Sequence, residues 1–228
     1  MNRLFAAAAA ILLALPLASC SQPGAGQTEQ QSLVDRATLA VQDMFAPASQ
    51  NDARNFLQKA KGALICPQLF KAGFFVGGEG GQCVLVGRSA NGWSAPAFYD
   101  IGSGSFGLQI GVQDSEVVFI VLTDKGFQAL LNSQFQIGAD ASVAVAAYGA
   151  GVAGATTAAF KADIVSFART RGLYGGISFE GSLISSQTGW NQAYYGRPLA
   201  AQQIVLQNEA SNPGAAPLSE TLARYAGR

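Results

Sequence analysis

The sequence predicts an α+β fold: a single domain with a curved antiparallel β-sheet or barrel-like core and flanking helices. Glycine is abundant, at 27 of 228 residues, and only 12% of the residues are charged. Together with many Val, Ile, Phe and Tyr residues, this composition is typical of a β-rich chain with tight turns. Apolar residues at helical spacing near both ends of the chain indicate the flanking helices.

The N-terminal segment has the pattern of a secretory signal. A positive charge at Arg3 precedes an apolar run, Leu4 to Leu17, which is shorter than the roughly 20 residues that a transmembrane helix needs. The following Leu17-Ala-Ser-Cys20 resembles the lipobox of bacterial lipoproteins, in which a diacylglycerol is attached to the cysteine and an acyl chain to its new amine. We therefore expect a signal peptide at 1–19 and lipidation at Cys20. The alternative is an ordinary signal peptide with a chance cysteine.

Residues 20–31 predict a flexible tether because they are mostly Ser, Gln, Gly, Pro and Thr. Ser21 at the second mature position resembles lipoproteins that are sorted to the outer membrane. Each buried methylene of the acyl chains contributes about 0.8 kcal/mol, so several chains hold a protein firmly. We expect an outer-membrane lipoprotein that faces the periplasm of the cell envelope.

Two helices are predicted after the tether. Apolar residues at helical spacing favour a first helix over Thr28–Phe45, ended by Pro47. A second short helix starts at Ser49 or Asn51 and stops at Gly62. The apolar residues of the two helices are Leu33, Val34, Ala37, Val41, Met44, Phe45, Phe56, Leu57 and Ala60.

From Ala63 the sequence pattern changes from helical spacing to short segments typical of strands. We expect a short strand that Pro67 closes, and two further strands around a glycine loop at Gly77–Gly81. Another strand pair is expected to turn at Asp114-Ser115. The expected strand segments are Ala63–Cys66, Phe70–Val76, Gln82–Gly87, Trp93–Tyr99, Ser105–Val112 and Glu116–Leu122.

The remaining chain continues the domain, which we place at 32–197, and ends in a helical extension at 198–228. Thr123 or Asp124 caps a predicted helix. Ala141–Tyr148 is small and apolar. A strand pair is expected around Arg171-Gly172, and two short helices follow. These elements span Ala162–Thr170, Leu173–Glu180, Leu199–Gln207 and Leu218–Tyr225.

Composition argues against several functions. The net charge is zero, which gives nucleic-acid binding no electrostatic support. The sequence holds no histidine, which removes Ser-His-Asp and Cys-His catalysis and histidine metal sites. Two G-x-G-x-x-G matches, at Gly102–Gly107 and Gly149–Gly154, lack the strand, helix and acidic residue of a dinucleotide site. Glu79 and Asp100 are better read as solvated carboxylates than as an acid–base pair. We expect no enzyme, cofactor or metal.

Cys66 and Cys83 remain once Cys20 is lipidated. In an oxidising periplasm they can form a disulfide. The alternative is two buried free thiols that behave as small apolar residues.

Basic residues suggest where anionic lipid headgroups would bind. Arg54, Lys59 and Lys61 lie on the polar side of the second helix, Lys71 follows, and Arg169 with Arg171 forms a second group. Each cation near a membrane surface contributes about 1 kcal/mol. The alternative is ordinary solvated charge. The aromatic residues Trp93, Trp190, Tyr194 and Tyr195 suit either a membrane interface or a half-buried position.

Six blocks of the chain, in order, resemble the SYLF domain family, over about Leu33 to Gly196. The resemblance implies a non-enzymatic protein that binds phosphoinositides or other anionic membrane lipids. Fungal members also bind actin, a partner that we do not carry over to a bacterial envelope. The alternative is a structural or protein-interaction role in the envelope, with protein partners unspecified. The blocks are Gly62–Pro67, Lys71–Gly81, Trp93–Phe98, Gly104–Gly111, Gly138–Val143 and Arg171–Ser182.

Overall fold

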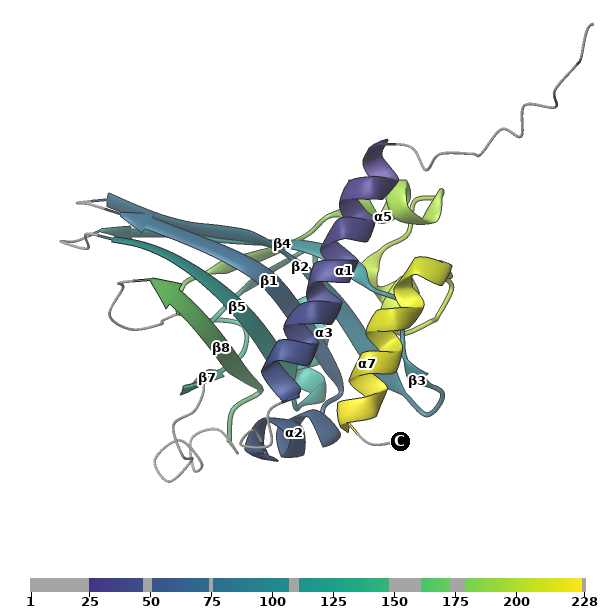
Figure 1. The fold of residues 1–228 in the computed structure, drawn as a ribbon, viewed down its shortest axis with the longest axis horizontal. Helices are drawn as coiled ribbons and strands as arrows, with labels where there is room; N and C mark the ends of the chain where they lie inside the picture. Colours follow the sequence, from purple (N-terminus) through teal and green to yellow (C-terminus); the bar gives the residue numbers. More distant parts are fainter. Residues whose placement is uncertain are drawn as a thin grey trace, which may run out of the picture.

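A computed structural model describes residues 25–46, 51–73, 76–106, 111–147, 161–172 and 179–226. Within these ranges nine strands form one strongly curved sheet, in the order β6-β9-β4-β2-β1-β5-β8-β7, with β3 paired to β2 (Figure 1). The expected α+β fold with a curved sheet is therefore confirmed. The strands are β1 (Gly62–Gly73), β2 (Val76–Ser89), β3 (Gly92–Trp93), β4 (Ala97–Phe106), β5 (Gly111–Val121), β6 (Gln134–Gln136), β7 (Val143–Ala147), β8 (Ile164–Gly172) and β9 (Leu183–Ser186).

Helices cover the sheet from more than one side. Helix α1 crosses the face of the central strands, and α7 runs beside it (Figure 1). The expected signal peptide and Cys20 lie outside the described residues. The helices are α1 (Ala25–Phe45), α2 (Asn51–Gln58), α3 (Asp124–Leu131), α5 (Thr188–Tyr195), α6 (Ala201–Val205) and α7 (Ala216–Ala226), with a 3-10 turn η1 (Pro213–Ala215).

Helix α1 has the amphipathic pattern that its sequence predicts. All six of its predicted apolar residues, among them Leu33 and Phe45, are buried. The helix starts at Ala25, so it includes residues 25–31 of the expected tether. Tertiary contacts explain the longer helix, because Gln31 donates to the Gly214 carbonyl oxygen and accepts from the Tyr194 hydroxyl.

The central strands β1, β2 and β5 lie between two apolar cores. One core packs under α1, α2 and α7 and includes Ile65 and Val84. The other lies on the opposite face with α3 and α6 and includes Leu64 and Leu85. Neighbouring residues of a strand point to opposite faces, so burial on both faces requires an almost continuous apolar run. Ala63–Cys66 is such a run, and all four residues are fully buried.

Three expected strand boundaries are wrong. Strand β1 does not end at Pro67 but continues to Gly73, because a bulge between Ile65 and Gln68 accommodates the residue that cannot donate a ladder hydrogen bond. Gly77–Gly81 is not a loop, since it pairs with β1 on one side and β4 on the other. Asp114-Ser115 is not a turn, since it lies within β5 and pairs with β1 and β8.

The pairing partners also differ from those expected. Strands β4 and β5 follow each other in sequence but are separated in the sheet by β2 and β1. Strand β8 pairs with β5 and runs parallel to β7, and residues 173–178 of its expected partner lie outside the described residues. The predicted cap of α3 is confirmed, because the Thr123 hydroxyl accepts from the Gly126 amide.

The C-terminal segment is part of the main packing. Leu218 and Leu222 of α7 are fully buried in the core beneath α1. The aromatic residues Trp190, Tyr194 and Tyr195 belong to helix α5. Helix α7 of the expected C-terminal extension therefore packs against the same core as α1.

Cys66 and Cys83 form a disulfide between β1 and β2, with their Cα atoms 4.2 Å apart. Both residues are fully buried. The bond lies beside the Pro67 bulge, where the register between the two strands shifts.

Candidate functional site

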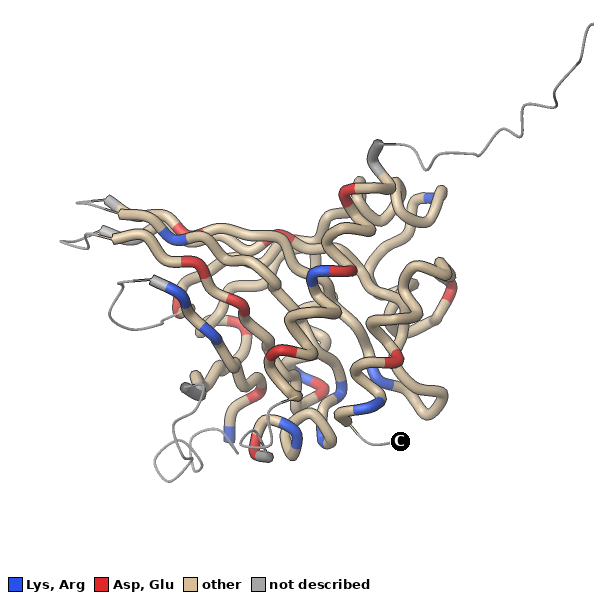
Figure 2. The backbone as a smooth tube through the Cα atoms, in the orientation of Figure 1, with Lys and Arg blue, Asp and Glu red and all other residues tan. Residues whose placement is uncertain are grey.

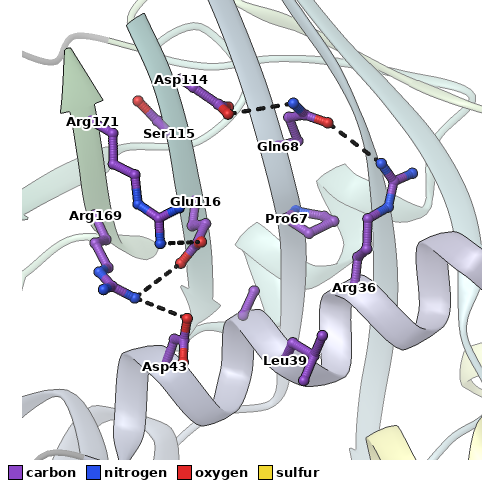
Figure 3. Close-up of a pocket in the computed structure, with 11 residues that line it drawn as sticks. Arg36, Leu39, Asp43, Pro67, Gln68, Asp114, Ser115, Glu116, Arg169 and Arg171 are labelled. Atoms are coloured by element: carbon purple, nitrogen blue, oxygen red, sulfur yellow. Dashed lines mark hydrogen bonds and ion pairs between the residues drawn. The ribbon is translucent and has the colours of Figure 1, made fainter.

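A charged cleft lies between α1 and the strands β1, β5 and β8, with a volume of about 340 Å³ (Figure 3). We call it the arginine cleft. Acidic and basic side chains line it together with apolar and amide groups. Its lining residues are Arg36, Leu39, Ala40, Asp43, Pro67, Gln68, Asp114, Ser115, Glu116, Arg169 and Arg171.

Secondary-structure periodicity places these side chains. Arg36, Leu39 and Asp43 are spaced by three and four residues, so they share the outer face of α1. On the strands the period is two. Glu116 pairs with Arg169, and Asp114 pairs with Arg171, so these side chains face the same way across β5 and β8.

Two series of polar contacts cross the cleft (Figure 3). In the first, Arg169 Nη1 lies 2.9 Å from Asp43 Oδ2 and 3.7 Å from Glu116 Oε2, and Arg171 Nη2 lies 3.6 Å from Glu116 Oε1. In the second, Gln68 donates to Asp114 at 3.3 Å and accepts from Arg36 at 3.4 Å.

Glu116 is the most shielded carboxylate of the cleft. Its side chain is 21% exposed, and its Oε2 atom is shielded from solvent and has no hydrogen-bond donor among the residues that the structure describes. Burial raises the pKa of Glu116, the two arginines lower it, and Asp43 and Asp114 raise it further, so the net pKa lies above the ordinary value. The Glu116 carboxylate therefore has less compensation from its neighbours than burial demands.

Exposed apolar side chains surround the arginine cleft. The three most exposed large apolar residues of the described chain are Leu39 (59%), Val112 (58%) and Phe70 (51%). Leu39 lines the cleft itself. Phe70 lies opposite Asp114 and lines an adjoining groove of about 330 Å³, which shares Arg36 with the cleft. Val112 lies two residues from Asp114 and therefore on the same face of β5.

The six cations expected to bind lipid do not gather in one place. Arg169 and Arg171 line the cleft. Arg54 donates to the carbonyl oxygens of Phe45 and Ala46 at the end of α1. Lys59 follows α2 and is exposed.

Lys61 and Lys71 lie away from the cleft. Lys61 forms an ion pair with Asp124 at 2.8 Å, at the opposite end of β1. Lys71 is on the other face of β1 from Phe70 and pairs with Glu79 at 3.9 Å. The sequence-based set therefore reduces to the two arginines of β8.

Sequence reasoning missed Arg36, Leu39, Asp43, Asp114 and Glu116 as site residues. A signal was available, because Asp114 and Glu116 alternate on one strand as Arg169 and Arg171 alternate on another. Strand neighbours with opposite charges at period two indicate pairing. This signal could be used only if β5 was expected to pair with β8. The turn expected at Asp114-Ser115 prevented that expectation, because it divided β5 into two segments.

Other expected groups are distributed through the fold. Tyr194 is buried, and Trp93, Trp190 and Tyr195 are half-buried against the cores, which supports the packing alternative for the aromatic residues. Glu79 and Asp100 lie on opposite faces of the sheet and form no acid–base pair.

In the described ranges, no group of three or more Cys, Asp or Glu residues is arranged to hold a metal ion. Over the same ranges, no helix is both long and apolar enough to span a bilayer.

The fold and the cleft define a class of protein. It is an α+β domain with a curved sheet, and a solvent-open cleft lined by both acidic and basic side chains lies beside helix α1. Comparison with known proteins then gives the family. The Ysc84 family, described as "Las17-binding protein actin regulator", matches residues 102–225, more than half of the chain.

Three eukaryotic proteins are similar to this chain. The human "SH3 domain-containing YSC84-like protein 1" is 30% identical over 168 residues, which cover 73% of this chain and 49% of that protein. An SH3 domain-containing protein of Schizosaccharomyces pombe is 31% identical over 196 residues, with 84% and 44% covered. "LAS seventeen-binding protein 3" of Saccharomyces cerevisiae is 30% identical over 172 residues, with 73% and 37% covered.

The chain belongs to the Ysc84 family, whose shared domain is the SYLF domain. It spans about half of the length of these relatives or less. Their names are those of SH3 domain-containing and Las17-binding proteins, not of enzymes.

Proposed function

We propose that this protein is a lipid-anchored protein of the cell envelope whose SYLF domain binds phospholipid headgroups at the arginine cleft. Acyl chains on Cys20 hold it at the outer membrane, facing the periplasm. The cleft receives the phosphate of an anionic or phosphoinositide-like headgroup. The proposal combines the signal and lipobox pattern of residues 1–20 with the geometry of the domain.

The observation that carries the proposal is the position of the exposed apolar side chains around the cleft. Leu39, Phe70 and Val112 are each more than half exposed and lie on the same side of the molecule as Arg36 and Arg171. Apolar side chains beside arginines suit a membrane interface, since the apolar groups enter the acyl boundary while guanidinium groups bind phosphate. Exposed apolar groups gathered at one place mark interaction surfaces.

The anchor makes a weak headgroup contact sufficient. A domain tethered near a bilayer experiences a high effective concentration of headgroups, so affinity in solution need not be high. Anchor and cleft therefore have separable roles, one in residence at the membrane and the other in recognition.

Vesicle co-sedimentation tests the cleft. The mature chain from residue 20, made with Cys20→Ala so that it carries no lipid, is mixed with neutral and anionic vesicles at low and moderate salt. Arg171→Gln is expected to weaken binding about tenfold, because it removes charge-assisted hydrogen bonds to phosphate. Lys61→Gln is the matched control, with the same change of charge on an exposed lysine far from the cleft.

Equal losses in the two variants would show general electrostatic attraction in place of a site. Binding that disappears in moderate salt for both variants would give the same answer, since salt screens exposed charges. No binding to any vesicle would contradict headgroup recognition altogether.

A separate experiment tests the anchor. In the cells that make the protein, Cys20→Ala should move it from the membrane fraction to the soluble fraction of the envelope. Mass spectrometry of the N-terminal peptide should show a diacylglycerol and an acyl chain on Cys20. An unmodified N-terminus would contradict the lipoprotein proposal and leave the cleft proposal untouched.

The second candidate function is docking of a protein partner on the same face. The family description favours it, because it names Las17 binding. Protein docking predicts that Arg171→Gln weakens binding of the partner while vesicles never bind the domain. The vesicle experiment therefore separates the two functions.

A further inference from the structure

Eight small or apolar residues form a continuous surface beside α1, on the same side of the sheet. Residues directly opposite each other on paired strands point to the same face. Phe70 of β1 pairs with Gly80 of β2, which pairs with Gly102 of β4. Gly102 in turn pairs with Leu183 of β9 and completes a row across four strands. A second row lies two residues further along the strands. We call this surface the glycine face, and its residues are Phe70, Ala72, Gly78, Gly80, Gly102, Gly104, Val112 and Leu183.

The packing of the domain does not require the four glycines of this face. A Cβ at Gly104 would meet nothing within 4 Å among the residues that the structure describes. A Cβ at Gly78, Gly80 or Gly102 would meet only a backbone oxygen of the sheet, between 3.7 and 3.9 Å away, which is an ordinary contact. Glycine weakens a strand, and it is typical of places where another body approaches the backbone closely. The glycine face therefore has the character of a contact surface.

Exposed apolar side chains border the glycines on two sides. Val112 and Phe70 are 58% and 51% exposed on β5 and β1, and Leu183 is 42% exposed on β9. Charged positions are few along these strands in Figure 2. Lys71 and Glu79, which alternate with residues of the glycine face, form their ion pair on the opposite side of the sheet. An uncharged surface with exposed apolar groups marks an interaction site.

The start of α1 determines where this face lies relative to the anchor. Ala25, the first residue of α1, is five residues after Cys20. A chain extends at most about 3.6 Å per residue, so α1 begins within about 18 Å of the lipidated cysteine. Leu33 and Arg36 of α1 line one groove with Phe70 and Gly80, so the N-terminal half of α1 borders the glycine face. In Figure 1, the start of α1 and the strand ends that carry this face lie along the same upper side.

We propose that the glycine face is the surface that lies on the bilayer, with Phe70, Val112 and Leu183 at the acyl boundary. This inference rests on the lipid anchor of the proposed function and adds the orientation of the domain. Asp114 pairs with Phe70 and Arg171 pairs with Asp114, so the row of Phe70 continues into the arginine cleft. With the glycine face on the bilayer, the cleft lies at the edge of the contact, at the level of the headgroups. Apolar surfaces of this kind enter the headgroup and acyl boundary by about 5–10 Å.

A second copy of the chain fits the glycine face less well than a bilayer does. The two ends of the sheet meet at the bridge between Ile137 and Ala141, so the core that contains Leu64 is inside the curve. The glycine face is on the outer, convex side. Two convex surfaces touch over a small area, whereas stable interfaces bury about 800 Å² on each partner. A fluid bilayer can follow a convex surface.

Vesicle binding tests the glycine face at residues outside the arginine cleft. The mature chain with Cys20→Ala is titrated with vesicles of phosphatidylcholine and phosphatidylglycerol at moderate salt. Leu183→Ala should weaken binding about fivefold, because fewer methylenes leave water. Leu206→Ala is the matched control, since Leu206 is 40% exposed and follows α6. Gly80→Asp should weaken binding about tenfold or more, because a carboxylate would have to leave water. Ala90→Asp adds the same charge at an exposed turn after β2 and should have little effect.

Fluorescence measures the depth of the same two leucine positions. Leu183→Trp and Leu206→Trp each add one tryptophan to the two that the chain already contains. Phospholipids with brominated acyl chains should quench the added emission of Leu183→Trp and leave that of Leu206→Trp unchanged. Equal quenching of the two, or quenching of neither while the protein binds vesicles, would overturn the proposed orientation.

The outcomes distinguish the inference from the function on which it rests. If Leu183→Ala and Gly80→Asp bind like their controls while Arg171→Gln still weakens binding, the glycine face is overturned and headgroup binding stands. If Leu183→Ala weakens binding and Arg171→Gln does not, the cleft is overturned and the glycine face stands. A dimer in solution that Leu183→Ala dissociates would overturn the bilayer in favour of a second copy. Absence of binding to any vesicle would overturn both proposals.

Discussion

The two halves of strand β1 have opposite characters, although they belong to one continuous strand. Before Pro67, Ala63–Cys66 is fully buried between two apolar cores. After the bulge, Gln68 and Phe70 are exposed on the face that α1 leaves open. The first half of β1 therefore stabilises the fold, whereas the second half presents exposed side chains that can contact a ligand.

The neighbouring strands β2 and β5 also change from buried to exposed residues near the bulge in β1. In β2, Cys83–Val86 is fully buried, whereas Gly77–Gly81 extends the sheet with little side-chain volume. In β5, Val117–Val121 is buried, whereas Asp114 and Glu116 line the cleft. We call the two parts the buried half and the open half of the sheet. The comparison teaches that the buried half of the sheet stabilises the fold, whereas the open half carries the residues of the cleft. Substitutions in the two halves should therefore have different consequences.

The largest effect is expected from Leu64→Ala in the buried half. Leu64 is fully buried, so truncation should lower the free energy of unfolding by about 2–5 kcal/mol through lost burial and a residual cavity. Val112→Ala in the open half is the control and should change stability by less than about 0.5 kcal/mol. Urea denaturation measures both. Similar losses in the two variants would break the comparison.

Removing the disulfide tests the boundary between the halves. The bond closes a sequence separation of 17 residues, so the double variant Cys66→Ala, Cys83→Ala should lose about 3 kcal/mol by the chain-entropy estimate. Denaturation of the oxidised protein and the double variant gives the difference. An unchanged free energy of unfolding would mean that packing alone holds β1 to β2 beside the bulge.

Two adjacent glycines of β2 provide a sharper comparison, because their side chains would point to opposite faces. A Cβ at Gly81 would overlap the carbonyl oxygen of Gln68, so Gly81→Ala should cost about 1–3 kcal/mol. A Cβ at Gly80 would lie 3.7 Å from its nearest neighbour, the Ile101 carbonyl oxygen, an ordinary contact. Gly80→Ala should therefore be close to neutral in thermal unfolding. A large loss at Gly80 would show that the open face is packed after all.

The smallest effect concerns pH and the polar contacts at the buried end of the sheet. Burial alone would raise the pKa of Asp163, but hydrogen bonds from Thr123 and Ser142 and the charge of Lys125 lower that pKa to about 2. A lowered folded-state pKa contributes stability above the unfolded value of 3.8, and this contribution is lost as pH falls from there towards 2. Asp163→Asn should remove about 1–2 kcal/mol at neutral pH and flatten this acid dependence.

The acid dependence of Asp163→Asn is read from unfolding curves between neutral and acidic pH, compared with the unsubstituted protein. Glu220→Gln is the control, since Glu220 is an exposed carboxylate on α7. An identical acid profile for Asp163→Asn and the unsubstituted protein would contradict the assigned role of Asp163.

The sequence predicted the buried half better than the open half. The helical spacing in α1 and the apolar run Ala63–Cys66 were readable because burial leaves a periodic pattern. Gly77–Gly81 was misread as a loop, since glycines in a strand and in a turn look alike without the neighbouring strands. Asp114-Ser115 was misread for a similar reason, because polar residues in an open strand resemble a turn.

The candidate site was predictable only in part. Arg169 and Arg171 were singled out from the sequence, and the structure places both in the cleft. Lys59, Lys61 and Lys71 were grouped with Arg54 because they are near in sequence. Alternation on a strand and the curvature of the sheet direct these side chains to different places. Nearness along the chain is a weak guide to nearness in space for a sheet whose neighbouring strands are distant in sequence.

By itself, the sequence determined the α+β class, the apolar face of α1, the cap of α3 and the family, because these depend on local patterns and on the order of motifs. Only the tertiary structure decided that β5 pairs with β8 and that Arg36 reaches over Gln68, which together form the cleft. The physical reason is that hydrogen bonds between strands form wherever backbones meet. Strand pairing is therefore selected by the packing of the whole domain and is not written in any one segment.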